Sequence, residues 1–418
     1  MPRLGLLRDH DFRGLFLSTT VSQFGQQITM LALPLVAVLA LDAEEFEVGL
    51  LAATSTLAFL LIGLPAGAWV DRMRRRNVLV NTDLARAAVL LTIPLAWWGG
   101  VLTLWHLYAA ALAVGALTVF FDVAYQSYLP SLVGRERLVE GNAKLETVRS
   151  TAQIGGPALA GQLIAWLTAP VALAADAIAM GASALFVVRI RRREPRPDAA
   201  RGTDLASDIK EGLAFVLRNR LLASIVACAG WANLCMGAFM AMVVVFLPRE
   251  LGLSPGEIGL LYSCFGLGGL AGAFLVGRLV RWWGEGRAVW LSILVFTPGL
   301  LLVPGAEEGW RTWLGAFGLA YCGIGVVVFN VTQVSFRQRL TPDRLLGRMN
   351  ATVRFIVWGT QPLGAFAGGL IGQAHGARAA LWIAAAGACL AFLPVLCSPL
   401  RNMHELPSSA EDLEPARV

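Results

Sequence analysis

Long apolar segments separated by short polar turns make up most of this chain. A bilayer core of about 30 Å requires about 20 apolar residues in each helix that crosses it. Counting segments of that length, and dividing the longest at turns, predicts twelve membrane-spanning helices. They cover residues 13–41, 46–70, 77–98, 101–128, 140–167, 170–190, 220–248, 255–280, 287–304, 311–337, 347–373 and 377–399. We therefore expect an all-α integral membrane protein.

The pattern repeats itself half a chain later. The string GLL at residues 49–51, followed by Gly67, recurs at residues 259–261, followed by Gly277, at an offset of 210 residues. Such a repeat in the same direction along the chain predicts two six-helix bundles related by a parallel duplication.

A polar stretch separates the two predicted bundles. We expect an N-terminal bundle over residues 1–190, a cytoplasmic linker over 191–219, a C-terminal bundle over 220–400 and a polar tail over 401–418. Apolar residues recur at helical spacing within 205–217, which predicts an amphipathic helix at the membrane interface. Such a helix could instead dock a partner protein.

The distribution of charged residues predicts which side of the membrane each turn faces. Of the 418 residues, 56% are hydrophobic and only 15% are charged, too few charges for the surface of a soluble protein. With the N-terminus inside, only Arg249, Arg311 and Arg378 of the 34 Lys and Arg residues fall outside. Because cytoplasmic turns carry the excess of basic residues, we expect a multi-pass protein of the cell inner (plasma) membrane, with both termini cytoplasmic.

Several kinds of chemistry are not indicated by this sequence. Its six cysteines lie singly and its four histidines are scattered, so we predict neither a disulfide framework nor a metal site. Neither lysine, Lys144 or Lys210, follows a glycine, which excludes a GK[ST] phosphate loop. We expect no cofactor, no enzymatic activity and no nucleic-acid partner.

Residues 63–76, GLPAGAWVDRMRRR, end one predicted helix and begin the next. Glycines four apart, Gly63 and Gly67, let a neighbouring helix approach closely. Asp71 lies beside several arginines in this string. Its carboxylate can pair with a helix end in one conformation and lose that partner in another. The string resembles the loop motif between the second and third helices of the major facilitator superfamily, except that Arg74 stands where the family usually has glycine. The resemblance implies a conformational switch formed by Gly67, Asp71, Arg72, Arg75 and Arg76.

The fifth predicted helix contains a proline among glycines. In this superfamily a Gly-Pro pair followed by glycine is typical of exporters, and is thought to seal the helix against a neighbour in the second bundle. The resemblance implies an antiporter motif formed by Gly155, Gly156, Pro157 and Gly161. The alternative is an ordinary packing motif, because small residues are common wherever membrane helices pack.

Shorter strings narrow the resemblance to one branch. They are DFR at residues 11–13, SQ at 22–23, FD at 121–122 with AYQ at 124–126, and ADA at 175–177. They are similar to the drug-export branch that contains the macrolide efflux proteins and the enterobactin exporter. This resemblance implies export by alternating access about a site near the bilayer midplane.

Acidic residues at membrane depth are costly and are functional candidates by default. We take Asp122, Asp176 and Glu146 as candidates for proton coupling, with Asp122 first because helix four lines the cavity in the family. Alternatively, Glu146 forms a structural ion pair with Arg149, as Asp83 does with Arg86, and Asp176 caps or pairs near the outer surface.

Polar and soft residues recur on one face of the four helices that line the cavity in the family. The substrate-binding candidates are Gln26, Met30, Gln126, Asn233, Met236, Met240, Asn330 and Gln333. Methionines make an adaptable surface, which suits an apolar or amphipathic substrate. Packing with interhelical hydrogen bonds is the alternative for each position.

The sequence thus predicts a secondary active exporter of lipophilic or amphipathic small molecules, drug-like or macrolide-like, working by proton antiport. Its expected partners are a small-molecule substrate, protons and the lipid bilayer, and we expect a monomer. The alternatives are a siderophore or metabolite exporter or an importer of the same fold, a passive facilitator, and a non-transporting membrane sensor or scaffold.

Overall fold

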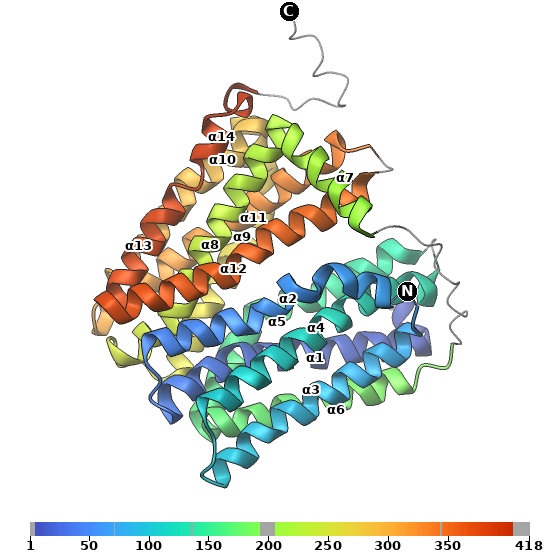
Figure 1. Ribbon diagram of the computed structural model, residues 1–418, viewed down its shortest axis with the longest axis vertical. Coiled ribbons are helices and arrows are strands. Elements are labelled where there is room, and N and C mark those ends of the chain that lie inside the picture. The colour runs from blue at the N-terminus through green and yellow to red at the C-terminus, as the bar shows by residue number, and fades with distance from the viewer. Residues whose placement is uncertain (1–4, 71, 135–136, 193–204, 343–344, 404–418) are drawn as a thin grey trace, which may run out of the picture. The chain divides into compact units, whose positions relative to one another are not determined.

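The structure, a computed structural model, describes residues 5–70, 72–134, 137–192, 205–342 and 345–403 (Figure 1). Within these ranges the regular elements are all helices. Two compact units are present, one formed by residues 1–201 and 247–263 and the other by residues 202–246 and 264–418.

The helices confirm the predicted all-α membrane fold, and a described helix lies at each of the twelve predicted spans. In the first half they are α1 (His10–Leu35), α2 (Glu45–Val70), α3 (Arg75–Trp98), α4 (Leu104–Val133), α5 (Leu138–Leu167) and α6 (Ala169–Val188). In the second half they are α8 (Arg220–Arg249), α9 (Pro255–Trp283), α10 (Glu285–Phe296), α11 (Thr312–Leu340), α12 (Leu346–His375) and α13 (Ala377–Cys389). Short elements η2 (Val36–Ala40), η4 (Thr297–Leu302) and α14 (Leu393–Leu396) extend or follow α1, α10 and α13.

Ten of the described helical segments are long and apolar enough to cross a membrane by composition alone. The 30-residue helices α5 and α12 are absent from that group. Both are long enough to span, but charged, polar and glycine residues lower their mean hydropathy. Each packs against other helices of its own unit, which is where polar positions are tolerated in a membrane protein.

Helix ends follow from local chemistry. The Asp9 carboxylate Oδ1 accepts hydrogen bonds from the backbone N–H groups of Asp11 at 2.9 Å and Phe12 at 3.2 Å, and so caps the start of α1. Gly376, with φ of 85°, separates α12 from α13, and this left-handed conformation is one that glycine adopts without a steric penalty.

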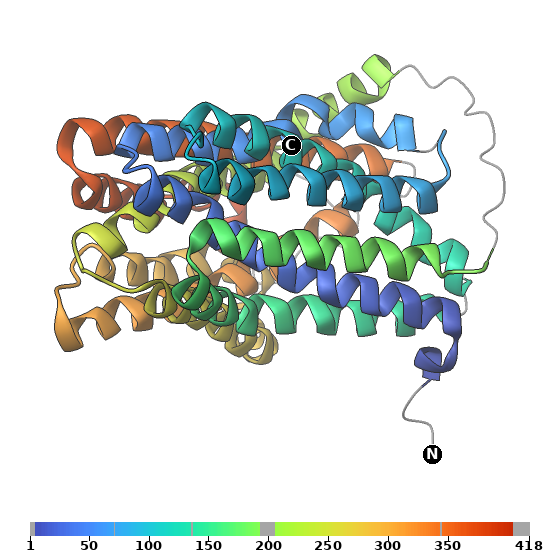
Figure 2. The same cartoon turned by 90° about the horizontal axis from the view of Figure 1, so that it is seen from below.

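In the first unit, α1 packs against α5 and α6, α3 against α4 and α6, and α2 against α4 (Figures 1 and 2). The core of this unit contains Phe12, Leu15, Leu79, Tyr128 and Val187 among other buried residues. A glycine sets the closest approach of α2 to α4: a Cβ added at Gly115 would stand 2.6 Å from the Ser55 carbonyl oxygen. Small residues at such crossings let membrane helices pack through their backbones.

The predicted antiporter motif lies where α5 meets the first turns of α9, inside the first unit. A Cβ added at Gly161 would stand 3.0 Å from Gly259 Cα and nearer still to the Pro255 carbonyl oxygen. The backbone N–H of Ala158, next to Pro157, donates to Ser263 Oγ of α9 at 3.0 Å. The proline disturbs the helix ladder, and a neighbouring hydroxyl satisfies a backbone group beside it, as the membrane interior requires.

One ion-pair cluster in this unit joins two turns that the predicted topology places on the same side. Arg249 Nη2 lies 3.1 Å from Asp42 Oδ1, and Arg249 Nη1 lies 3.5 Å from Glu45 Oε1. The predicted topology puts Arg249 and the acidic first turn outside. The contact agrees with their lying on one side, while the orientation of the termini stays a prediction.

In the second unit, α10 packs against α11, and α12 against α13 and α7 (Leu205–Arg218). The residues predicted to form the amphipathic linker helix, 205–217, lie within α7, while the position of this helix at the membrane interface stays a prediction. Its residue Val216 is fully buried in the core of this unit, and Glu211 forms an ion pair with Arg348 of α12. Val216 thus anchors α7 to this unit, whereas Leu213 and Leu217 of the same helix are exposed. The predicted domain boundaries stay a prediction.

We expect Gly161→Ala to lower the free energy of unfolding by about 1–3 kcal/mol, because the added methyl group overpacks the α5–α9 crossing. Gly155→Ala is the matched control on the same helix, since a Cβ there meets no described heavy atom within 4 Å. The measurement is thermal unfolding of the purified protein in detergent. Equal melting temperatures for the two variants would contradict the close packing of α5 against α9 at Gly161.

Candidate functional site

The loop motif begins on α2 and ends on α3. Asp71 lies outside the described residues, so the predicted switch acid has no described geometry. Among the described atoms, none lies within 4 Å of a Cβ added at Gly67, and at Gly63 the nearest atoms belong to Phe59 of the same helix. A close approach of a neighbouring helix is therefore not seen at these glycines among the described atoms, and the role of Gly67 in the switch stays a prediction.

Arg76 of the motif has a definite partner. Its guanidinium donates from Nε to the Val187 carbonyl oxygen at 3.3 Å and from Nη2 to that of Val188. These are among the last carbonyls of α6, which have no partner within the helix. A cation at that position also suits the negative end of the helix dipole. Arg76 therefore ties the start of α3 to the end of α6.

Asp11 of the DFR string caps the chain just after α6. Its two carboxylate oxygens accept the backbone N–H groups of Arg191 at 2.9 Å and Arg192 at 3.0 Å. The Arg192 side chain donates in turn to the Leu132 carbonyl oxygen at the end of α4. Helices α1, α3, α4 and α6 are thus joined by charge-assisted hydrogen bonds at this end of the first unit.

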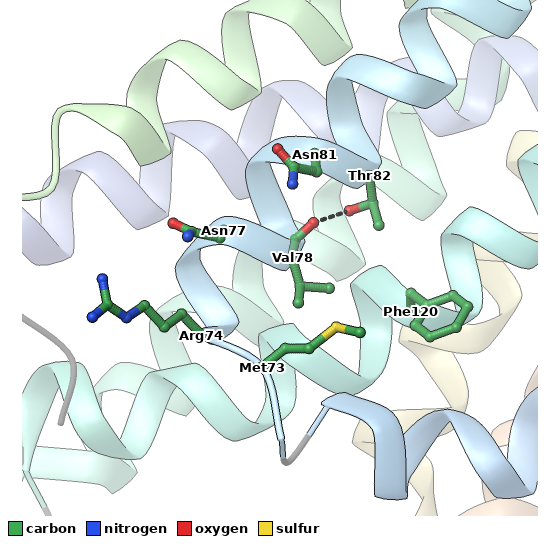
Figure 3. A pocket seen from close by; sticks show the side chains of 7 residues that line it. All are labelled: Met73, Arg74, Asn77, Val78, Asn81, Thr82 and Phe120. Atoms are coloured by element: carbon green, nitrogen blue, oxygen red, sulfur yellow. Dashed lines mark hydrogen bonds between the residues drawn. The ribbon is translucent and has the colours of Figure 1, made fainter. Parts of the chain in front are cut away.

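A hollow of about 450 Å³ opens beside the start of α3 (Figure 3). Its lining residues are Met73, Arg74, Asn77, Val78, Asn81, Thr82 and Phe120. Met73 and Val78 point toward Phe120 of α4, whereas Arg74, Asn77 and Asn81 follow the outer side of α3 (Figure 3). The hollow thus combines an apolar wall with a basic and amide rim.

The second unit has a hollow near the matching position of the repeat. It measures about 640 Å³ and is lined by Phe274, Gly277, Arg278 and Arg281 of α9. Arg281 stands where the repeat aligns Asp71. The acid of the first half is therefore replaced by a cation in the second, and the two halves differ in charge at this place.

A fully buried ion pair lies in the first unit between α3, α4 and α6. Asp83 is 0% exposed and Arg86 is 2% exposed, and the guanidinium Nη2 contacts Asp83 Oδ1. The expected pairing of these two residues is confirmed. The guanidinium also lies 4.4 Å from the ring centroid of Phe121, and its Nη1 is 3.5 Å from Thr118 Oγ1, both on α4.

Two serines extend this pair toward α1. Ser183 Oγ of α6 donates to Asp83 Oδ2 at 2.6 Å, and it lies 2.8 Å from Ser18 Oγ of α1. Both carboxylate oxygens of Asp83 therefore have partners, as a buried charge requires. Three helices contribute to one polar cluster in an otherwise apolar interior.

Asp176 lies on the same face of α6, seven residues before Ser183. It is fully buried, and the Thr29 hydroxyl of α1 donates to its Oδ2. Its other oxygen, Oδ1, has no hydrogen-bond partner among the described residues. A Cβ added at Gly25 would collide with this oxygen, so the carboxyl rests against the α1 backbone. The alternative expectation that Asp176 caps or pairs near the outer surface is met as far as pairing goes, by Thr29, and its depth in the membrane stays a prediction.

The two other proton-coupling candidates have different surroundings. Asp122 is half-buried on α4, next to Phe121, whose ring stacks on Tyr125 with centroids 6.2 Å apart. Glu146 pairs with Arg149 at 3.0 Å, and both side chains are more than half exposed. The Glu146–Arg149 pair expected from sequence is confirmed, and its exposure leaves both charges largely in contact with the surroundings.

Three substrate-binding candidates belong to the first unit. Gln26 and Met30 are exposed one turn apart on α1, and Gln126 is exposed on α4. Their role in substrate binding stays a prediction. Gln27, by contrast, packs over Gly156, where an added Cβ would collide with its side chain.

The remaining candidates belong to the second unit. Asn233 of α8 donates to the Ala229 carbonyl oxygen of its own helix at 2.9 Å. Gln333 of α11 is buried and its Nε2 donates to Asn330 Oδ1 at 3.4 Å, while its Oε1 has no partner among the described residues. Met236 and Met240 are half-buried on α8. Local hydrogen bonds thus occupy part of this polar set.

Sequence reasoning missed Thr29, Ser18 and Ser183 as partners of buried acids. Their spacing was a usable signal, because residues 18, 22, 25 and 29 share one face of α1 while 176, 180 and 183 share one face of α6. Among the described residues, no group of three or more His, Cys, Asp or Glu side chains could hold a metal ion.

Known proteins resemble this chain over nearly its whole length. The enterobactin exporter EntS of Citrobacter koseri is 30% identical over 363 residues, covering 83% of this chain and 82% of that protein. The multidrug efflux pump Tap of Mycobacterium bovis is 28% identical over 416 residues, covering 95% of this chain and 94% of that protein.

Solved structures share the fold. A bacterial homologue of the iron transporter ferroportin aligns with a TM-score of 0.76 at 17% identity, covering 94% of this chain and 98% of that one. The family model described as transmembrane secretion effector matches residues 3–417. The chain therefore belongs to the transmembrane secretion effector family of the major facilitator superfamily, whose members are transporters and not enzymes.

Proposed function

We propose that this protein is a secondary active exporter of lipophilic or amphipathic small molecules, driven by proton antiport. The observation that carries the proposal is the likeness to relatives named as exporters, together with acids buried in the first membrane unit. Such acids are expensive in a membrane and are retained where protons or ions move. A bacterial multi-pass inner-membrane transporter with both termini cytoplasmic is the expected setting.

The proposed mechanism is alternating access. The two six-helix bundles rock about a substrate site near the bilayer midplane, and entry of a proton from outside drives substrate outward. Gln26, Met30 and Gln126, together with Met236 and Met240, supply the soft and polar surface for substrate. Flexible methionines suit compounds of varied shape better than a single rigid sugar or anion.

Siderophore export is the second candidate. Several relatives with 28–30% identity are named enterobactin exporters, and each covers 83% of this chain. The two candidates differ in the compound carried rather than in the fold. A panel that includes lipophilic dyes, macrolides and a catecholate siderophore separates them, because only one class should compete for efflux.

We expect cells that express the protein to export lipophilic cationic dyes or macrolides, and the export to collapse when an uncoupler removes the proton gradient. Asp122→Asn should abolish this proton-driven export while leaving insertion and substrate binding, because the amide cannot carry the proton. The measurement is dye efflux with and without uncoupler. Full proton-driven export by the variant would remove Asp122 from the mechanism.

We expect Asp71→Asn to impair transport without abolishing substrate binding, because loss of the charge weakens contacts that stabilise one conformation at the cytoplasmic face. Glu308→Gln is the matched control, an acid-to-amide change at an exposed residue in another turn. Initial efflux rates and equilibrium binding of the same dye are compared. Transport by Asp71→Asn at the wild-type rate would contradict a role for Asp71 in the conformational switch.

A further inference from the structure

The polar cluster between α1, α3 and α6 contains two buried carboxyls and one buried cation. Asp83 and Asp176 are both 0% exposed; Arg86 contacts Asp83, and Asp176 lies about two helical turns before Ser183 on α6. If both acids were ionised, the cluster would carry a net negative charge in the interior of a membrane bundle. Because an uncompensated buried charge is costly, one of the two carboxyls must hold a proton.

The hydrogen bonds indicate which carboxyl is protonated. Both oxygens of Asp83 are partnered, one by Arg86 and the other by Ser183 at 2.6 Å, which stabilises its ionised form. Asp176 receives one donor, Thr29, and its Oδ1 has no partner among the described residues. A carboxylate oxygen left without a donor in an apolar interior is unfavourable, so Asp176 is the neutral acid.

No other ionisable group of the packed helices faces Asp176. Helices α1, α3 and α5 and the short η2 pack against α6. The charged residues of α1 lie in its first turn, about 20 Å or more along the helix from Thr29. Those described on α5 lie in its first half, which ends before the Pro157 region, and η2 has none. The protonation equilibrium of Asp176 therefore depends on the charges of Asp83 and Arg86.

We propose that Asp176 is an internal proton-binding site of the first unit, and that Asp83 competes with it for the charge of Arg86. On release, the Asp176 O–H bond breaks and the proton leaves to water, and on uptake the same bond forms again. The buried Arg86 Nε has no hydrogen-bond partner among the described residues, so the guanidinium keeps one donor unused. The role of this site in transport rests on the proposed proton antiport.

The arrangement couples the proton to helix packing. When Asp176 ionises, it draws Arg86 away from Asp83, and Asp83 is the acceptor for the Ser183 hydroxyl that also meets Ser18 of α1. The same proton therefore changes contacts on α1, α3 and α6 together. Bistable packed elements of this kind convert a local charge change into a conformational preference.

The test is infrared spectroscopy of the purified protein in lipid membranes across a pH series, which requires no substrate. We expect wild type to show the carbonyl band of a protonated buried carboxylic acid that is lost at alkaline pH and is absent in Asp176→Asn. Asp83→Asn frees Arg86 for Asp176 and should lower the titration midpoint of the band by about 1–3 pH units. Arg86→Gln removes the cation and should raise that midpoint by a similar amount.

Thr29→Val is a conservative variant, because it replaces only the hydroxyl that contacts Asp176. We expect it to shift the frequency of the band. Thr20→Val is its matched control on α1, since the Thr20 hydroxyl donates to the Phe16 carbonyl oxygen of its own helix at 2.8 Å. It should leave the band unchanged.

A missing Asp176 band, or midpoints that move in the same direction in Asp83→Asn and Arg86→Gln, would overturn the proposal. Uncoupler-sensitive dye efflux by wild type without that band would overturn the proton site while leaving antiport standing. The band with its opposite midpoint shifts, but without any proton-driven efflux, would support the site and refute the proposed antiport. The two proposals can therefore fail separately.

Discussion

A guanidinium buried inside a membrane-spanning bundle is the constraint around which the first unit is arranged. Arg86 requires partners at that depth, because the free-energy cost of an isolated buried charge is larger than the stabilisation from any single packing contact. Its partners come from its own helix through Asp83 and from α4 through Phe121 and Thr118. Ser183 of α6 then holds Asp83 in place. The positions of α3, α4 and α6 relative to one another are thereby restricted by a few polar atoms.

Close backbone contacts supply the remaining order. Lipid tails are as apolar as leucine, so helices in a membrane associate through close packing and interhelical hydrogen bonds rather than through burial of apolar surface. Gly115 against α2 and Gly161 against α9 are such contacts, and Gly364 meets the Leu234 backbone in the same way in the second unit. Ser263, bonded to the backbone beside Pro157, shows that an irregular helix is accepted where a neighbour provides the missing partner.

Charged residues at one end of the first unit have a structural task beside any role in switching. Arg76 caps α6, and Asp11 caps the segment that follows it. A change of conformation that moved α3 relative to α6 would have to break these charge-assisted bonds. Arg76 therefore belongs to the loop motif and also caps the end of α6.

The sequence by itself determined the helices, their number, the parallel repeat and the amphipathic segment that became α7. These follow from hydrophobic periodicity and length, which are local properties of the chain. It also identified the Asp83–Arg86 and Glu146–Arg149 pairs, because residues three apart on a helix are neighbours in any fold. The superfamily was recognisable from the order of Gly67, Asp71 and the arginines.

Only the tertiary structure decided which of these residues share an environment. Asp83 and Asp176 are 93 positions apart in the sequence, and no local rule predicts that both are fully buried in the same unit. The fold also showed that Gly67 has no close neighbour among the described atoms, whereas Gly161 does. Long-range contacts depend on how helices pack, and packing is a property of pairs of surfaces that a single periodic pattern does not specify.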